Sequence, residues 1–372
     1  MKKFLIIFLM CCLFSLCSCI SNDENIENNV EHQSLQTEHN QQIRALWLSC
    51  YELSPMFKNG TKDFFKTEII KVFEKCKINN INTLFVQVRP FCDSFYPSSI
   101  FDWSAFSLSD SGEVPDFDPL QIIIDIAENY DISIHAWINP YRVSYDENYN
   151  NNQNISNFAF SCDSGVYLNP SNVLAQNFIL SGVREILENY KVDGIHIDDY
   201  FYPQTKENFD EANYNAYLDN GGELSKNKWR CENVNSLVAA LYSLVHSVNS
   251  DAVFSISPAG DIHKNKDSHY ADVELWLSQK GYADWIVPQI YYGFENEFKP
   301  FENTANKWLK LAEKSEIKLI CGLALYKEGK MDKAAGIGLN EWVEHNDIIE
   351  RQIDYVDSVG FDGYSLFSYS SL

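Results

Sequence analysis

Residues 193–203 read DGIHIDDYFYP, and this stretch gives the clearest indication of the fold. Its alternating Ile195 and Ile197 are typical of a buried β-strand. A segment with helical periodicity, 172–190, precedes it, and an Asp-Gly turn separates the two. A helix followed by a strand that ends in two adjacent aspartates indicates an α/β fold with polar groups at the carboxyl end of a strand.

Further strand-like runs alternate with helical segments on both sides of this stretch. Helical periodicity lies between the runs, as at 61–79 and 118–130, and no break in composition divides the chain. The pattern predicts one (β/α)₈ TIM-type barrel over residues 44–372, with the eighth outer helix missing because nothing helical follows the last run. The expected strands are 44–51, 83–89, 133–141, 193–200, 252–259, 284–292, 318–326 and 362–369.

Several expected strands carry polar side chains on one face and apolar side chains on the other. Because successive side chains of a strand point to opposite faces, we expect the apolar faces to meet the helices. The polar faces then converge on the barrel axis, near the carboxyl-end rim where barrel active sites lie. Three long connections, 90–117, 142–171 and 201–228, follow strand ends and are expected to wall the same cleft.

The net charge and the composition limit the classes of partner. The chain carries a formal charge of −23, so nucleic acid and an anionic membrane surface would both repel it. Aromatic residues make up 14% of the chain, which suits both sugar stacking and ordinary core packing. No P-loop, GxSxG elbow or GxGxxG motif occurs, and no cofactor or metal is expected.

The N-terminus predicts export and attachment to a membrane. Two lysines and a short apolar run end in Leu16-Cys17-Ser18-Cys19, which resembles a bacterial lipobox. We expect a lipoprotein signal peptide over 1–18, a lipid anchor on Cys19, and a disordered polar tether over 19–43. Cys17 is the rival acylation site, and a secretory signal without lipid is the alternative. The expected location is the cell envelope.

The two adjacent aspartates, Asp198 and Asp199, are the candidate catalytic residues. Strand alternation would point only one of them inward, but at the rim the chain leaves the strand and both can reach the cleft. Neighbouring carboxylates repel, so one proton is held to higher pH, which yields one acid and one charged partner. Glycoside cleavage requires such a pair. A metal-binding pair and a helix-capping aspartate are the alternative interpretations.

Motifs on five strands resemble those of the glycosyl-hydrolase-like family 10 proteins. They are QVRP (87–90), HAWINPYR (135–142), IHIDDYFYP (195–203), ISPAG (256–260) and DWIVPQIYY (284–292). The resemblance covers about residues 43–372. It implies a bacterial envelope enzyme that hydrolyses glycan, several relatives being linked to peptidoglycan glycan strands, with Asp198 and Asp199 at the centre. The family often has a basic residue after the SPxG motif, and here Lys264 is the nearest cation.

The aspartate motif is also similar to two other glycosidase groups. Family-18 chitinases end their fourth strand in a related run, but Tyr200 stands where their acid would be expected. Family-84 hexosaminidases use two adjacent Asp, and that resemblance implies that Asp198 orients the substrate acetamido group as internal nucleophile while Asp199 is the acid. The rival is hydrolysis by two separated carboxylates, with a distant partner from a set of three: Asp93, Asp261 and Glu295.

Supporting roles are expected for polar and aromatic residues near the rim. Arg89 would bind a substrate carboxylate or hold Asp198, and Tyr202 would bind a reacting oxygen. Histidines and amides would bind sugar hydroxyls, and rings would stack on sugar. The expected substrate-binding residues are Arg89, Asp93, His135, Trp137, Asn139, Tyr141, His196, Tyr200, Tyr202, Gln289, Tyr291 and Tyr292.

The sequence thus predicts a glycoside hydrolase acting on N-acetylated envelope glycan. A non-catalytic glycan-binding surface lipoprotein is the main alternative, because it would keep the same aromatic cleft. A metal-dependent deacetylase on the same barrel is a weaker one.

Overall fold

The computed structural model describes residues 42–146, 155–203 and 208–372. The expected signal peptide, Cys19 and nearly all of the expected tether lie outside these residues. The first strand, β1, begins at Ile43, and the compact unit that contains it runs from Gln42 to Leu372. The barrel therefore begins slightly before the expected boundary at residue 44.

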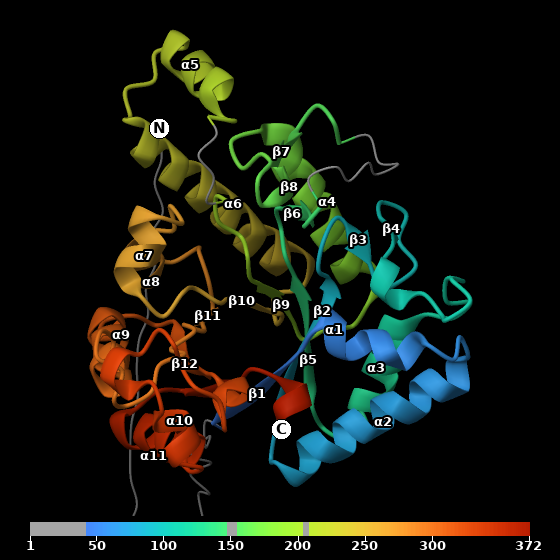
Figure 1. Ribbon diagram of the computed structural model, residues 1–372. Coiled ribbons are helices and arrows are strands. Elements are labelled where there is room, and N and C mark those ends of the chain that lie inside the picture. Colours follow the sequence, from blue (N-terminus) through green and yellow to red (C-terminus); the bar gives the residue numbers. More distant parts are fainter. Residues whose placement is uncertain (1–41, 147–154, 204–207) are drawn as a thin grey trace, which may run out of the picture. The chain divides into compact units, whose positions relative to one another are not determined.

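Eight parallel strands form a closed barrel, which confirms the fold expected from the sequence (Figure 1). Strand β1 pairs with β2 on one side and with β13 on the other, where Ala45 lies opposite Thr83 and Ser365. This pairing of the first strand with the last closes the sheet. The barrel strands are β1 (Ile43–Leu48), β2 (Thr83–Arg89), β5 (Ser133–Ile138), β9 (Gly194–Ile197), β10 (Val253–Ile256), β11 (Trp285–Ile286), β12 (Lys318–Leu323) and β13 (Gly363–Leu366).

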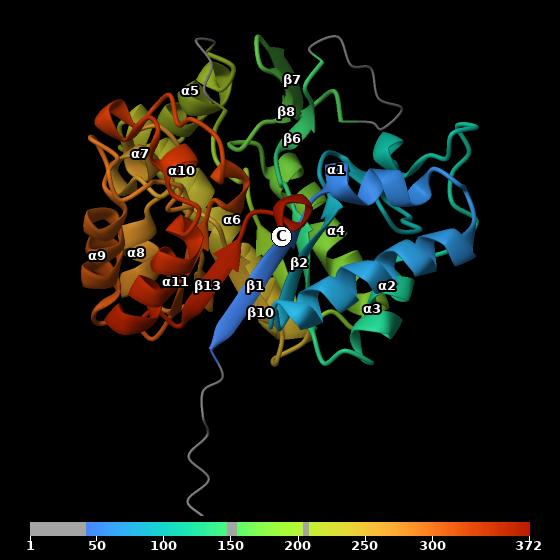
Figure 2. The same cartoon turned by 60° about the horizontal axis from the view of Figure 1, so that its bottom comes forward.

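Helices surround the barrel and cover the outer faces of its strands (Figure 2). Their starts follow local capping rules: the Asp118 side chain accepts from the N–H of Gln121, and Pro119 occupies the first helical position of α3. The outer helices are α2 (Lys62–Ile78), α3 (Pro119–Ala127), α4 (Val173–Asn189), α6 (Lys226–Val248), α7 (Ile262–Asp267), α8 (Val273–Ser278), α9 (Phe301–Ala312) and α11 (Ile348–Val359).

No eighth outer helix follows β13 in the described chain, as expected from the sequence. Only the 3₁₀ helix η5 (Tyr369–Ser371) comes after that strand. Of the described helices, none has both the length and the apolar character needed to cross a bilayer. The remaining short helices are α1 (Cys50–Leu53), η1 (Ser54–Phe57), η2 (Ala105–Ser107), α5 (Glu211–Asp219), η3 (Leu325–Lys327), η4 (Gly336–Gly338) and α10 (Glu341–Glu344).

The long connections after β2 and β5 contain small sheets. Strands β3 (Asp93–Ser94) and β4 (Asp102–Trp103) form a two-stranded ladder. Strands β6 (Arg142–Ser144), β7 (Ala159–Cys162) and β8 (Gly165–Leu168) form an antiparallel sheet in the order β6-β8-β7. This second sheet matters for the site because β6 and β8 hold side chains over the carboxyl end of the barrel.

The barrel interior is packed mainly with aromatic and branched side chains. Strand alternation places Phe85 and Trp47 inside, whereas Leu84 and Val86 pack outside against the helices. The interior cluster consists of Ile43, Ala45, Trp47, Phe85, Trp137, Val287 and Ile320. Because these side chains fill the barrel, open space for a ligand begins only above them, at the carboxyl ends of the strands.

Candidate functional site

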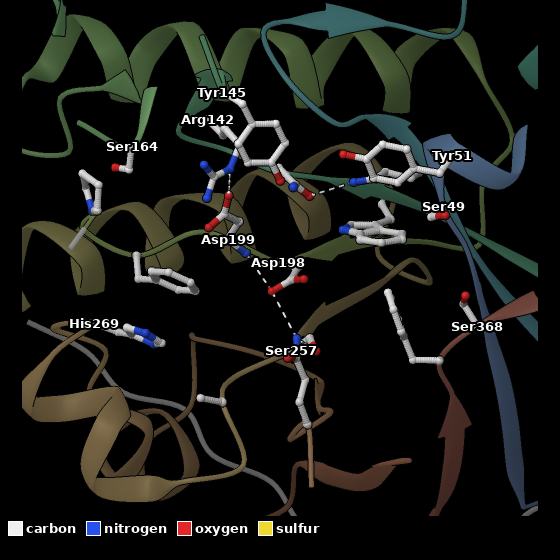
Figure 3. A pocket seen from close by; sticks show the side chains of 18 of the residues that line it. Ser49, Tyr51, Arg142, Tyr145, Ser164, Asp198, Asp199, Ser257, His269 and Ser368 are labelled. Atoms are coloured by element: carbon white, nitrogen blue, oxygen red, sulfur yellow. Dashed lines mark hydrogen bonds and ion pairs between the residues drawn. The ribbon is translucent and has the colours of Figure 1, made fainter. Parts of the chain in front are cut away.

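A pocket of about 790 Å³ opens at the carboxyl ends of the barrel strands (Figure 3). Its walls come from the segments that follow β1, β5, β9, β10, β11 and β13 and from the small sheet of β6 and β8. Of the long connections expected to wall the cleft, the one after β2 contributes no residue. The predicted site residues that line this pocket are Asp198, Asp199, Trp137, Asn139 and Gln289.

The two aspartates both reach the pocket because the chain turns sharply at the end of β9. The N–H of Asp198 still donates to the carbonyl of Ile138 at 3.2 Å, as a strand residue would. Asp199 then takes a left-handed conformation with φ +53°, which aspartate tolerates better than most residues. Its N–H donates to Oδ1 of Asp198 at 2.7 Å. The expectation that the rim would free both side chains from strand alternation agrees with this geometry.

The carboxyl group of Asp198 lies in an environment that favours its protonated form. Burial and the charge of Asp199 raise its pKa from 3.8 to about 7. Gln289 opposes this shift by donating from Nε2 to Oδ1 of Asp198 at 3.3 Å. The same amide nitrogen donates to Ser257 Oγ at 3.1 Å. The N–H of Asp199 and Nε2 of Gln289 therefore both donate to Oδ1 of Asp198. No donor among the described residues meets Oδ2.

Gln289 reaches the pair because its strand is interrupted. Strand β11 ends at Ile286, and Pro288 lacks the N–H that would continue the ladder. Gln289 then bridges to both neighbouring strands, opposite Ala259 and Gly322. This pairing fixes the backbone directly beside Asp198.

The carboxylate of Asp199 forms an ion pair with Arg142, a residue that the sequence analysis did not select. Nε of Arg142 donates to Oδ2 of Asp199, and about 15% of each side chain is exposed. The guanidinium lies over the rings of Tyr145 and Tyr167, at 4.6 and 4.8 Å from their centroids. Arg142 is the last residue of the HAWINPYR motif and lies one position beyond the expected strand 133–141, so strand alternation does not assign its direction.

Asn139, Gln87 and Trp137 form the floor of the pocket beside the aspartates. Gln87 accepts from the N–H of Cys50 at 2.8 Å and donates to Asn139 Oδ1 at 3.3 Å. Trp137 is 4% exposed, and its indole N–H has no hydrogen-bond partner among the described residues. These side chains are held in place before any ligand arrives.

Arg89 and Asp93 lie outside the pocket, contrary to expectation. The pairing of β2 with β5 shifts between Gln87 and Arg89, and this irregularity turns Arg89 out of the barrel. Its guanidinium lies over the ring of Phe101 at 4.5 Å and donates to the carbonyl of Pro140 at 3.4 Å. Burial raises the pKa of Asp93 to about 6, and its carboxylate accepts from the N–H of Phe91.

The two predicted histidines are part of the barrel interior. His196 stacks on Phe85 with ring centroids 4.0 Å apart, and His135 contacts the rings of Phe85 and Trp285. Burial lowers the pKa of His135 to about 3, and that of His196 well below its ordinary value. Alternation predicted their direction correctly, but they lie too deep to meet a ligand.

Three predicted tyrosines pack between the barrel and its helices. Tyr200 lies against Trp276, and the hydroxyl of Tyr202 accepts from Asn233 at 2.9 Å. Tyr141 is fully buried in the same outer core. The left-handed conformation of Asp199 explains why Tyr200 points outward, because it reverses the alternation that would place this residue inward.

The remaining two, Tyr291 and Tyr292, also do not line the pocket. Tyr291 contacts the rings of Phe367 and Tyr326, and its pKa is raised by burial and by the nearby charge of Asp198. Tyr291 therefore packs against the pocket lining without being part of it. The ring of Tyr292 faces Lys299 instead.

Several lining residues carried no signal in the sequence. Tyr51 and Tyr145 are 58% and 62% exposed at the mouth. On another wall, Phe201 stacks on His269 with centroids 3.8 Å apart. All of them come from connecting segments, where no periodicity indicates direction.

The pocket contains one further carboxylate, Glu52, which is fully engaged. One of its oxygens accepts from Ser49, and the other accepts from Ser368 and Ser370 at 2.6 Å each. The distant partners considered from sequence do not line the pocket, since Asp261 pairs with Lys299 and Glu295 is exposed elsewhere. Within the described ranges, no three His, Cys, Asp or Glu side chains are grouped as a metal ion would require.

Comparison with known proteins gives a family match over most of the barrel. A family model described as "Glycosyl hydrolase-like 10" matches residues 42–336. The chain is 31% identical to glycosyl hydrolase DigH of Escherichia coli (strain K12) over 314 residues, which cover 75% of this chain and 70% of that protein. It is 29% identical to glycosyl hydrolase YngK of Bacillus subtilis (strain 168) over 315 residues, covering 77% of this chain and 61% of that protein.

Solved structures share the fold. The PgaB (BpsB) glycoside hydrolase domain from Bordetella bronchiseptica aligns with a TM-score of 0.60 at 11% identity, covering 88% of this chain and 94% of that one. At this identity, the likeness supports the barrel architecture alone.

Proposed function

The chain belongs to the glycosyl hydrolase-like 10 family, and we propose that it is a lipid-anchored glycoside hydrolase that cleaves N-acetylated glycan of the bacterial cell envelope. Peptidoglycan glycan strands are the proposed substrate. The observation that carries the proposal is the unequal pair Asp198 and Asp199 at the floor of an aromatic pocket.

The pair supplies the two charge states that glycoside cleavage needs. Asp198, with a pKa raised to about 7 by burial and by its neighbour, keeps a proton that it can donate to the leaving oxygen. Asp199, held by Arg142, keeps a negative charge that can stabilise positive charge on the sugar. This division of roles is the reverse of the one implied by the resemblance to family-84 hexosaminidases.

The pocket also favours attack by the substrate's own acetamido group. A second free carboxylate would be needed for ordinary two-carboxylate hydrolysis, and the other lining carboxylate, Glu52, is occupied by three serines. In the proposed reaction, the acetamido oxygen bonds to C1, the glycosidic C1–O bond breaks, and Asp198 protonates the leaving oxygen. Water then attacks C1, the acetamido group is released, and the proton returns to Asp198.

Cleavage of purified, peptide-free glycan strands tests the enzyme proposal, with products identified by mass analysis. We expect Asp198→Asn and Asp199→Asn to abolish turnover while glycan binding persists. Asp131→Asn is the matched control, because Asp131 is also left-handed (φ +55°) but does not line the pocket. If the wild-type protein binds these strands and releases no product, the non-catalytic glycan-binding alternative replaces the proposal.

The attack by the acetamido group has its own test. Strands from which the N-acetyl groups have been removed should bind but remain uncut. Cleavage of these strands at the full rate would overturn the substrate-assisted step and leave the glycosidase proposal standing.

The proposed membrane anchor rests on the sequence of residues 16–19. Metabolic labelling with a radioactive fatty acid is expected to mark the wild-type protein and the Cys17→Ser variant. The Cys19→Ser variant should lose both the label and its place in the membrane fraction. Unlabelled wild-type protein in the soluble fraction would favour the secretory signal without lipid.

A further inference from the structure

Arg142 contacts only one of the two adjacent carboxylates. Its Nε donates to Asp199, its Nη1 donates to the hydroxyl of Tyr167, and its guanidinium lies over the rings of Tyr145 and Tyr167. Figure 3 shows the guanidinium above Asp199, with Asp198 farther away. The side chain thus has a fixed position before any substrate binds.

We propose that Arg142 is a positioning residue that decides which aspartate carries the negative charge and which carries the proton. Two carboxylates this close in a buried site share one proton at moderately acidic pH. A cation fixed on Asp199 favours ionisation of that group, so the proton remains on Asp198. The inference rests on the proposed function, because the charge order matters only if the pair acts on a substrate.

The other charged and titratable groups around the pocket do not compete for this role. Glu52 is held by serines after β1 and β13, and burial lowers the pKa of His269 to about 4, which leaves it neutral. Lys264 lines the pocket from α7 but forms no ion pair with either aspartate in the described chain. Burial raises the pKa of Tyr145 and of Tyr167, so the two rings beside Arg142 remain neutral phenols.

The surroundings of Arg142 favour arginine over lysine. A planar guanidinium can lie over aromatic rings and donate in two directions at once, whereas an ammonium group on a flexible stem does neither as well. Lysine would supply the charge but lose the fixed direction. The two substitutions therefore separate charge from geometry.

The test is the dependence of kcat/KM on pH for Arg142→Met and Arg142→Lys, with glycan strands as substrate. Loss of the cation leaves the Asp199 carboxylate without its ion-pair partner, so the acidic limb of the Arg142→Met profile should move up by about one pH unit or more. Arg142→Lys should keep the limb near its wild-type position while kcat falls. The control is Arg184→Met, which removes an exposed arginine paired with Glu188 on α4.

A merely structural role would lower activity without moving the limb. An Arg142→Met profile that superimposes on the wild-type profile after scaling would therefore overturn the proposal. Tyr167→Phe is a gentler variant that keeps the ring and removes only the hydroxyl that Nη1 contacts. It should shift the limb in the same direction by a smaller amount.

A direct titration separates this inference from the proposed enzyme activity. With ¹³C-labelled aspartate carboxyls, the spectrum at pH 5.5 should show Asp199 ionised and Asp198 protonated in the wild-type protein. In Arg142→Met, this difference should shrink. If no glycan is cleaved but the titration behaves as expected, the proposed function fails while the proposed charge order stands. An unchanged titration in Arg142→Met would overturn only the charge order.

Discussion

Asp198 and Asp199 are joined through the backbone of the second residue, whose N–H donates to the carboxylate of the first at 2.7 Å. Their carboxylates nevertheless face different partners, an amide for Asp198 and a guanidinium for Asp199. Adjacency in the chain therefore fixes the distance between the two groups, while strands far away in sequence make their environments unequal. A pair with this asymmetry can hold one proton and one charge at the same time.

The raised pKa of Asp198 makes this residue a cost to stability at neutral pH. Its folded pKa of about 7 lies above the ordinary value of 3.8. The contribution of the Asp198 carboxyl group to the free energy of unfolding is therefore fully present below pH 4 and is lost as the pH rises through 7. Asparagine keeps the Oδ1 acceptor without the charge, so Asp198→Asn should raise the free energy of unfolding at pH 8 by about 1–2 kcal/mol.

Urea unfolding at pH 5 and pH 8 measures this effect. The gain should be clearly smaller at pH 5, where the wild-type residue is already protonated. The exposed Asp131→Asn variant should show no such difference. An equal gain at both pH values would mean that the carboxyl group of Asp198 is not held in its protonated form.

Tyr51 at the pocket mouth is expected to bind substrate rather than support the fold. Its ring is 58% exposed and contacts Phe106 with centroids 5.2 Å apart. Tyr51→Ala should raise KM on glycan strands by about 3- to 10-fold, because an aromatic contact contributes roughly 0.5–1.5 kcal/mol. The kcat and the melting temperature should stay near wild-type values. Phe298→Ala removes a ring of similar exposure outside the pocket and should leave KM unchanged.

The interior histidines make the barrel sensitive to acid. The pKa of His135 is lowered by burial to about 3, so between pH 6.5 and that value the unfolded chain binds a proton that the folded chain does not. Stability should therefore fall with pH over this range, by up to about 1.4 kcal/mol per unit for each such histidine. His135→Phe, which can keep the ring contacts with Phe85, should lose about 1–2 kcal/mol less than wild type between pH 6.5 and 4.5.

Chemical denaturation across that pH range gives the comparison, and the exposed His345→Gln variant is the control. If His135→Phe and wild type lose stability in parallel, other groups account for the acid sensitivity.

The sequence predicted the barrel because its strands carry clear period-two patterns with helices between them. It also predicted the position of Asp198, Asp199, Trp137, Asn139 and Gln289 at the rim. Those residues lie where a strand ends, and the carboxyl ends of all barrel strands meet at one face. Alternation and topology together were sufficient there.

The alternation of side chains fails as a guide where the backbone departs from an ideal strand. It also does not indicate how deep in the barrel an inward side chain lies. The irregularity after Gln87 turns Arg89 outward, and the left-handed Asp199 does the same to Tyr200. His135 and His196 face the axis as expected but lie below the pocket floor. Arg142 was missed because it begins a separate small sheet, whose placement over the barrel depends on long-range packing.

The hydrogen bond between Trp47 and His196 should contribute measurably to the stability of the barrel. The indole N–H donates to Nε2 of His196 at 3.1 Å, so Nδ1 carries the hydrogen and meets Ser255 Oγ at 2.8 Å. Trp47→Phe keeps an aromatic ring but leaves Nε2 buried without a donor, which should lower the free energy of unfolding by about 1–3 kcal/mol. In a double-mutant cycle, Trp47→Phe should cost less when combined with His196→Phe, because no unpaired nitrogen then remains. Equal costs in the two backgrounds would show that packing, and not this hydrogen bond, accounts for the loss.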